Sequence, residues 1–258
     1  MKPRIKSTRD NEPMFIGWAE TPPADRRFFL RAGMGLTAAA AALGFGVAAL
    51  QPPPGTGRWD PDAVREWRGI VSAEPYAMLR TLDLGAGPQT ALLACLGKCG
   101  VAARLGALAG QAVVVKGSLI QRGPHSMIAV DEEGDWIRTD RAGGVDPAMA
   151  FPAGEPLGDV TLNGEILDSK CWFGAMRPAS GKVHKACAAL CIRGGIPPAF
   201  FARDSKGQGA LMIMTDSGRA YGPGLLSLVA DPVRVSGSVQ RVGDLLVLDA
   251  PLARIQRL

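Results

Sequence analysis

The sequence predicts a mainly β fold: one N-terminal transmembrane helix followed by two small β-barrels of related sequence. Three observations lead to this prediction. Residues 32–50 are uncharged, short apolar runs broken by Gly, Asp and Pro fill the rest, and two segments, 59–141 and 158–258, repeat one order of elements. Apolar residues make up 47% of the chain and charged residues 21%, a composition that excludes a wholly disordered protein.

The uncharged run at 32–50 has the length of a transmembrane helix. At about 1.5 Å per residue its nineteen residues cross a hydrocarbon core of about 30 Å. The run is rich in Ala and Gly, so an Ala-rich helix of a soluble core is the alternative. Arginines lie on its N-terminal side, which favours a cytoplasmic leader (1–31) and a periplasmic body after residue 51. We expect an uncleaved anchor in the inner membrane, because the leader is long and a clean Ala-x-Ala cleavage site is absent.

The end of the leader resembles the twin-arginine export signal, in which two arginines precede a spacer, Phe, Leu and a basic residue. Asp25 stands where that signal usually has Ser or Thr. The resemblance implies export of an already folded protein, often one that carries a cofactor or assembles with a partner. The matching residues are Arg26, Arg27, Phe29, Leu30 and Arg31.

The net charge of +5 lies mainly in this leader. Residues 1–51 carry seven Lys and Arg against four Asp and Glu, whereas the remainder carries 22 against 20. A nucleic-acid-binding protein would carry its basic excess on the folded domain, so we expect no nucleic-acid partner.

Two linkers separate the predicted domains, a Pro-rich one at 51–58 and a Gly/Pro-rich one at 142–157. In each domain an opening strand with a glycine is followed by an apolar strand, a Gly turn, a short Leu-containing helix and an alternating strand, at 113–120 and 233–239. Five short strands with a small helix before the fourth are the outline of an OB-fold barrel.

The second domain has about 25 extra residues between its first two strands. Gly69 and Gly117 of the first domain are 48 positions apart, whereas Gly164 and Gly237 of the second are 73 apart. We place this insertion at 169–200.

The insertion contains the predicted metal ligands Cys171, His184, Cys187 and Cys191. The run from Lys182 to Ile192 predicts a helix, on which the histidine and the last two cysteines share one face at i, i+3 and i+7. Cys171 lies thirteen positions before the histidine, far enough to fold back onto them. One imidazole and three thiols suit zinc, copper as Cu(I), or an iron–sulfur cluster.

Other roles for these cysteines stay open. In an oxidising periplasm Cys171 would form a disulfide with Cys187 or Cys191, leaving a scaffold that binds a protein partner without metal. Alternatively, Cys187 and Cys191 would serve a thiol–disulfide oxidoreductase. Cys95 and Cys99 fall on a strand and a turn, where we expect either a buried small residue with a turn cysteine or a disulfide pair.

The insertion resembles small exported bacterial proteins with the pattern G-x-[IV]-x-D-x2-C…H-x2-C-x3-C. That resemblance implies export and this site, and no reaction. The matching residues are Gly164, Ile166, Asp168, Cys171, His184, Cys187 and Cys191.

No catalytic residue is predicted. The sequence has no P-loop, no G-x-S-x-G nucleophile elbow and no C-x-x-C-H haem motif. We therefore expect a membrane-anchored binding or accessory protein, a subunit or assembly factor of a membrane redox complex, rather than an enzyme.

Overall fold

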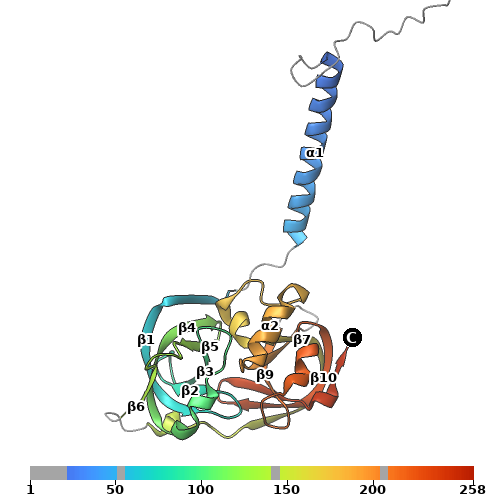
Figure 1. Cartoon of the computed structure of the whole chain (residues 1–258). Coiled ribbons are helices and arrows are strands. Elements are labelled where there is room, and N and C mark those ends of the chain that lie inside the picture. Colours follow the sequence, from blue (N-terminus) through green and yellow to red (C-terminus); the bar gives the residue numbers. More distant parts are fainter. Residues whose placement is uncertain (1–21, 51–55, 141–145, 204–208) are drawn as a thin grey trace, which may run out of the picture. The chain divides into compact units, whose positions relative to one another are not determined.

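The computed structural model describes residues 22–50, 56–140, 146–203 and 209–258, which fall into two units (Figure 1). One unit contains a single helix, and the other contains all the strands and the short helices. The predicted leader up to residue 21, and parts of both predicted linkers, lie outside the described residues.

Helix α1 (Pro23–Leu50) has 28 residues, none of them buried, and includes the predicted span. Its length and composition allow it to cross a membrane. The residues that resemble the export signal lie in its N-terminal part, where Phe29 and Leu30 are exposed.

The first barrel closes because β1 pairs with both β2 and β4, in the order β1-β2-β3-β5-β4. β3 and β5 run parallel, and the other neighbours are antiparallel. The strands are β1 (Arg58–Ser72), β2 (Met78–Thr81), β3 (Gln89–Cys95), β4 (Ala112–Arg122), β5 (His125–Val130) and an added edge strand β6 (Ile137–Thr139). The 3-10 turns η1 (Ala102–Arg104) and η2 (Gly106–Leu108) lie between β3 and β4, and η3 (Pro147–Met149) follows β6.

The second barrel repeats this topology, in the order β7-β8-β9-β11-β10 with β10 closing onto β7. Again the third and fifth strands are parallel. The strands are β7 (Glu155–Asp168), β8 (Pro198–Arg203), β9 (Gly209–Thr215), β10 (Pro232–Val242), β11 (Leu245–Asp249) and an added edge strand β12 (Ile255–Arg257). The 3-10 turn η6 (Pro223–Ser227) precedes β10, and η7 (Leu252–Arg254) precedes β12. Two closed five-stranded barrels of OB type confirm the predicted fold class.

The insertion between β7 and β8 carries the helices of the site. They are a one-turn π-helix η4 (Cys171–Ala175), a 3-10 turn η5 (Lys182–His184) and helix α2 (Lys185–Arg193). The predicted helix from Lys182 to Ile192 is thus confirmed, with a 3-10 first turn.

The glycines of the opening strands, Gly69 and Gly164, occupy equivalent positions in the two barrels. Gly69 of β1 lies opposite Val113 of β4, and Gly164 of β7 lies opposite Val233 of β10. A Cβ atom at Gly69 would come within 2.1 Å of the Arg80 carbonyl oxygen, and one at Gly164 within 2.4 Å of the Phe201 carbonyl oxygen. The close approach of the next strand therefore requires glycine at both positions.

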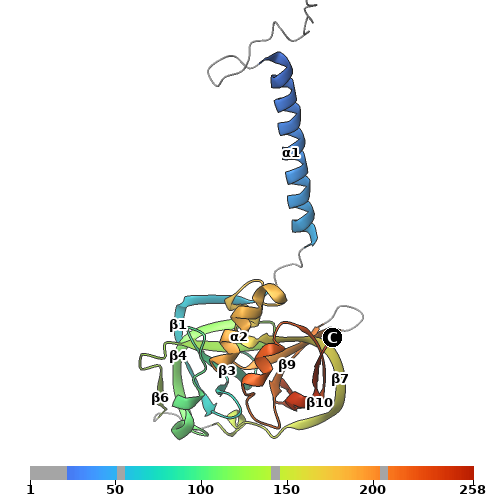
Figure 2. The same ribbon diagram turned by 45° about the vertical axis from the view of Figure 1, so that its right-hand side comes forward.

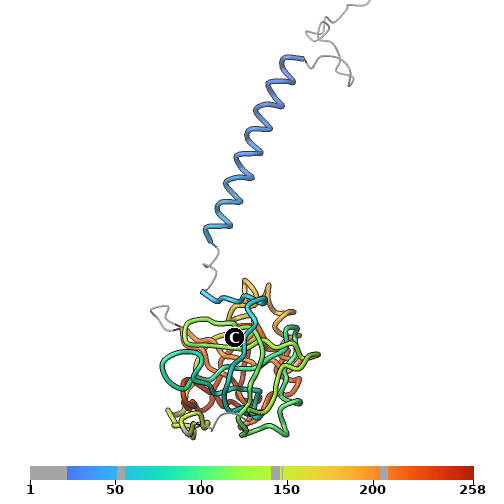
Figure 3. Tube along the Cα trace, turned by 90° about the vertical axis from the view of Figure 1, so that its left-hand side faces the viewer, coloured from blue at the N-terminus to red at the C-terminus, as the bar shows by residue number. Residues whose placement is uncertain are grey.

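Each barrel has an apolar core, and a third apolar cluster joins the barrels to the insertion. Trp67 and Leu93 lie in the first core, and Phe200 and Met214 in the second. The third cluster combines Leu92, Ile120 and Met127 of the first barrel with Leu167, Ile213 and Leu245 of the second and with Cys171, Phe173 and Cys191 of the insertion. The two barrels therefore lie side by side, and α2 lies near their junction (Figures 1 and 2). In the view of Figure 3 one barrel lies in front of the other.

Alanine at these aligned glycines is expected to destabilise the fold. Gly69→Ala and Gly164→Ala should each lower the free energy of unfolding by about 2 kcal/mol, because the methyl group meets a backbone oxygen. Gly106→Ala is the matched control, since a Cβ there has nothing within 4 Å. Urea unfolding of the full chain, followed by circular dichroism, measures the difference; equal midpoints for the three variants would contradict it.

Candidate metal centre

Two short segments bring the three cysteines of the insertion together. Cys171 lies in the turn that follows β7, where its backbone N–H donates to Asp168 Oδ1 over 2.8 Å. Cys187 and Cys191 lie one turn apart on α2. That helix ends at two glycines, of which Gly195 has a φ of +98°, and Pro197 and Pro198 then start the return to β8.

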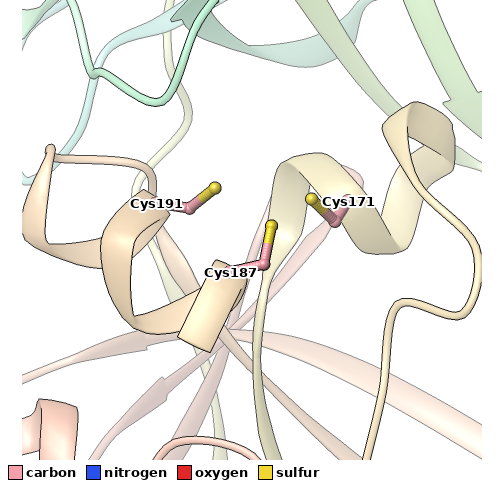
Figure 4. A group of neighbouring side chains, drawn as sticks. All are labelled: Cys171, Cys187 and Cys191. Carbon is pink, nitrogen blue, oxygen red and sulfur yellow. The ribbon is translucent and has the colours of Figure 1, made fainter. Parts of the chain in front are cut away.

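The three sulfur atoms point toward one another and all lie within 4.8 Å of each other (Figure 4). All three side chains are free thiols; those of Cys171 and Cys191 are buried, and Cys187 is half-buried. Cys187 therefore forms the accessible side of the group. Met176 adds a fourth sulfur, with its thioether Sδ 3.7 Å from Cys187 Sγ.

A lysine of the first barrel also reaches this group. Lys98 Nζ donates to Cys187 Sγ over 2.7 Å, and this bond raises the pKa of Lys98. A second ammonium group, of the buried Lys170, donates to the carbonyl oxygens of Cys95, Leu96 and Gly97 over 2.6, 2.7 and 2.7 Å. Lys98 therefore contacts a thiol directly, whereas Lys170, the residue before Cys171, binds the turn that carries Lys98.

The thiols influence one another. The Cys171 thiol donates a hydrogen bond to Cys191, which raises the pKa of Cys171 and, against the effect of burial, lowers the pKa of Cys191. The charge of Lys98 contributes to the lowering at Cys191. Of these two thiols, Cys191 therefore loses its proton more readily than Cys171.

The fourth predicted ligand, His184, lies beside Cys171 but has another partner. Its Nε2 atom is 2.9 Å from Asp168 Oδ2, and both side chains are buried. His184, Asp168 and Cys171 have ligand atoms within 4.8 Å of one another, a second potential metal group that shares Cys171 with the three thiols. His184 as the fourth ligand of the thiols stays a prediction.

Cys95 and Cys99 form a disulfide, one of the two alternatives expected for this pair. The bond closes the turn that carries Lys98. Backbone carbonyl groups of the same turn accept the hydrogen bonds of Lys170. The same turn contacts the end of α2, where Gly100 N–H donates to the Gly194 carbonyl over 2.7 Å. The disulfide turn therefore forms one wall of the site.

Three contributors to the site were missed from the sequence: Lys98, Lys170 and Met176. Only Met176 and Lys170 had a local indication, because both lie inside the Cys/His insertion. Lys98 is 89 positions from Cys187, and only the packing of the two barrels brings them together.

Comparison of this chain with family models, with curated proteins and with solved structures finds no match. The fold and the site therefore rest on the sequence, the topology and the side-chain geometry.

The exposure of the sulfurs predicts the order in which they react. In the metal-free full chain iodoacetamide should label Cys187 before Cys171 and Cys191, and should leave Cys95 and Cys99 unlabelled until a reductant is added. Lys98→Met should slow the labelling of Cys187, because it removes the ammonium group that contacts the reacting sulfur over 2.7 Å. Lys116→Met, at an exposed position of β4, is the control; peptide mass spectrometry over time gives the rates, and equal rates at all three thiols would contradict the prediction.

Proposed function

We propose that this chain is a membrane-anchored periplasmic protein that binds Cu(I) through Cys171, Cys187 and Cys191. In this role it would serve a membrane redox complex as a metal-binding subunit or assembly factor. The observation that carries the proposal is the convergence of three free thiols within 4.8 Å, beside a thioether. Soft thiolate and thioether ligands favour Cu(I).

The ligand set supports Cu(I) over the other metals considered. A structural zinc site needs four ligands, whereas the thiol group brings together three, and His184 belongs to a second group that shares only Cys171 with it. An iron–sulfur cluster is usually held by four cysteines, whereas the disulfide leaves three of the five available.

The charges also support a monovalent metal. Three thiolates carry three negative charges. Lys98 donates to Cys187, and Lys170 directly precedes Cys171; thiolates at Cys171 and Cys191 would favour the charged form of Lys170, whose pKa burial otherwise lowers, so two of the three charges would be offset. A monovalent cation brings this group to neutrality, and a divalent cation leaves an excess positive charge in a largely buried site, which is costly. Binding would release the proton of Cys171, since a thiol coordinates as the thiolate.

Binding of Cu(I) is tested by competition with a chromophoric Cu(I) chelator under anaerobic conditions. The full chain should retain one equivalent of Cu(I). Cys171→Ser, Cys187→Ser and Cys191→Ser should each weaken binding by about 100-fold or more, because each removes one sulfur that binds the metal directly. Leu190→Ser, beside Cys191 on the exposed side of α2, is the matched control. His184→Gln should retain copper; its loss, or stoichiometric zinc instead of copper, would contradict the proposed three-thiol site.

A periplasmic location is supported by the arginines before the apolar part of α1 and by the Cys95–Cys99 disulfide, because such bonds persist in oxidising compartments. Alkaline phosphatase fused after Leu258 should be active, and Arg26→Lys/Arg27→Lys should abolish its export. An active cytoplasmic reporter at the same position would contradict this topology. Arg58→Lys/Arg65→Lys, at exposed positions of β1, is the matched control for the paired substitution.

A thiol–disulfide oxidoreductase is the second candidate, favoured by the lowered pKa of Cys191 beside the half-buried Cys187. In that reaction two thiols would become one disulfide, and the two electrons and two protons would pass to a substrate disulfide. Turnover of a disulfide substrate with glutathione, lost in Cys187→Ser, would favour this reaction over copper binding.

A further inference from the structure

We propose that the exposed face of α2, together with the half-buried Cys187 at its edge, is the docking surface for an acidic partner protein that presents its own thiols and exchanges Cu(I) with this site. The inference rests on the proposed copper function. It adds the chemistry of the partner and the place where the partner binds.

The exposed face follows the helical repeat from the 3-10 turn to the end of α2. Lys182, Ala186, Leu190 and Arg193 are exposed and three or four positions apart, so they form one stripe on the helix. Val183 adjoins this stripe and is 84% exposed, and Leu190 is 50% exposed. These two side chains add apolar surface to the otherwise cationic stripe.

The accessible sulfur of the metal site adjoins this stripe. Cys187 follows Ala186 directly and lies four positions after Val183 and three before Leu190. Met176, 42% exposed, and Lys98 contact its sulfur from the other elements. A ligand arriving over the α2 stripe therefore meets Cys187 first, while Cys171 and Cys191 stay buried behind it.

The charge of this region indicates an acidic partner. Residues 169–202 contain five Lys and Arg and no Asp or Glu. Three of these cations are engaged within the protein: Lys170 with three carbonyl groups, Arg177 with the carbonyl group of Gly57, and Lys185 with Asp231 over 2.7 Å. Exposed Lys182 and Arg193 form no ion pair with any carboxylate among the residues that the structure describes.

The nearby carboxylates do not cancel this charge. Asp168 is buried against His184, Glu165 accepts the N–H of Gly181, and Asp231 is bonded to Lys185 and Arg257. The exposed stripe of α2 with Lys182 and Arg193 is thus positive, and an acidic partner would be attracted to it electrostatically.

A partner protein fits this surface better than a lipid headgroup does. The half-buried thiol lies at the edge of the cationic stripe, and exchange of Cu(I) there needs an incoming soft ligand. Lipid phosphates and carboxylates are hard oxygen ligands and provide none, so contact with an anionic membrane is an outcome that the test must separate.

Copper transfer to two synthetic peptides tests the proposal. Both contain the same Cys-Gly-Gly-Cys, one flanked by glutamates and the other by lysines. From the copper-loaded full chain in nanodiscs of neutral lipid, transfer to the acidic peptide should be about tenfold faster at 20 mM salt, and the preference should vanish near 0.5 M salt. Lys182→Glu/Arg193→Glu should abolish the preference while leaving the copper content unchanged.

Arg219→Glu/Arg254→Glu, with the same change of charge at exposed positions outside the insertion, is the matched control and should retain the preference. Equal transfer rates for the two peptides, or a preference that survives Lys182→Glu/Arg193→Glu, would overturn the docking proposal while copper binding stands. Salt-sensitive flotation of the wild-type nanodiscs with phosphatidylglycerol vesicles, lost in the same variant, would also overturn it in favour of a membrane contact.

A second measurement needs no metal and therefore separates this proposal from the copper function. Fluorescence anisotropy should show the acidic peptide, with serines in place of its cysteines, binding the metal-free full chain more tightly than the basic peptide does. If wild type retains no copper, the proposed function fails. If the serine-containing acidic peptide does not bind the metal-free chain, the docking surface fails, whatever the result for copper.

Discussion

The site depends on one buried ammonium group. Lys170 is 2% exposed and donates to three successive carbonyl groups, those of Cys95, Leu96 and Gly97. A charge buried in this way is stable only with its donors satisfied, so the contact fixes the start of the insertion against the disulfide turn of the first barrel. The residue that follows is Cys171, whose position is therefore set by contacts that both barrels supply. Lys98, inside the same turn, is brought to Cys187 by that arrangement.

The far end of the insertion meets the same turn, through Gly100 and Gly194. A Cβ at Gly194 would lie 1.8 Å from the carbonyl oxygen of Lys98, so the two segments are in direct backbone contact. The disulfide turn thus contacts the insertion both before Cys171 and after Cys191. The thiols converge because the two ends of the insertion pack on one rigid element, and the apolar cluster between the barrels continues directly into Cys171 and Cys191.

The fold was predictable because its determinants are local. Period-two alternation, Gly turns and the repeated glycines led to two barrels, and the helix-forming run after Gly181 led to α2. The partners of the thiols were not predictable in the same way, since Lys98 lies in another barrel. For His184 the reason is geometric: it belongs to a 3-10 turn, which advances about 120° per residue instead of about 100°. The imidazole is hydrogen-bonded to Asp168 and lies with Cys171 in a second group of potential ligands, so its place as the fourth ligand of the thiols stays a prediction.

The cysteines of this chain thus fall into two chemical states. One pair forms a disulfide in a turn of the first barrel, and the other three are free thiols. The disulfide between Cys95 and Cys99 holds that turn closed. The three thiols lie in the insertion that packs on this turn, where they are reduced and close together. In an oxidising compartment three neighbouring thiols persist only if something occupies them or excludes oxidants. Burial protects Cys171 and Cys191, but the half-buried Cys187 needs another protection, which the proposed soft metal would supply. Export in the folded state, which the resemblance of the arginines at the start of α1 to a twin-arginine signal implies, would allow that metal to be loaded in the reducing cytoplasm, before the thiols meet an oxidant.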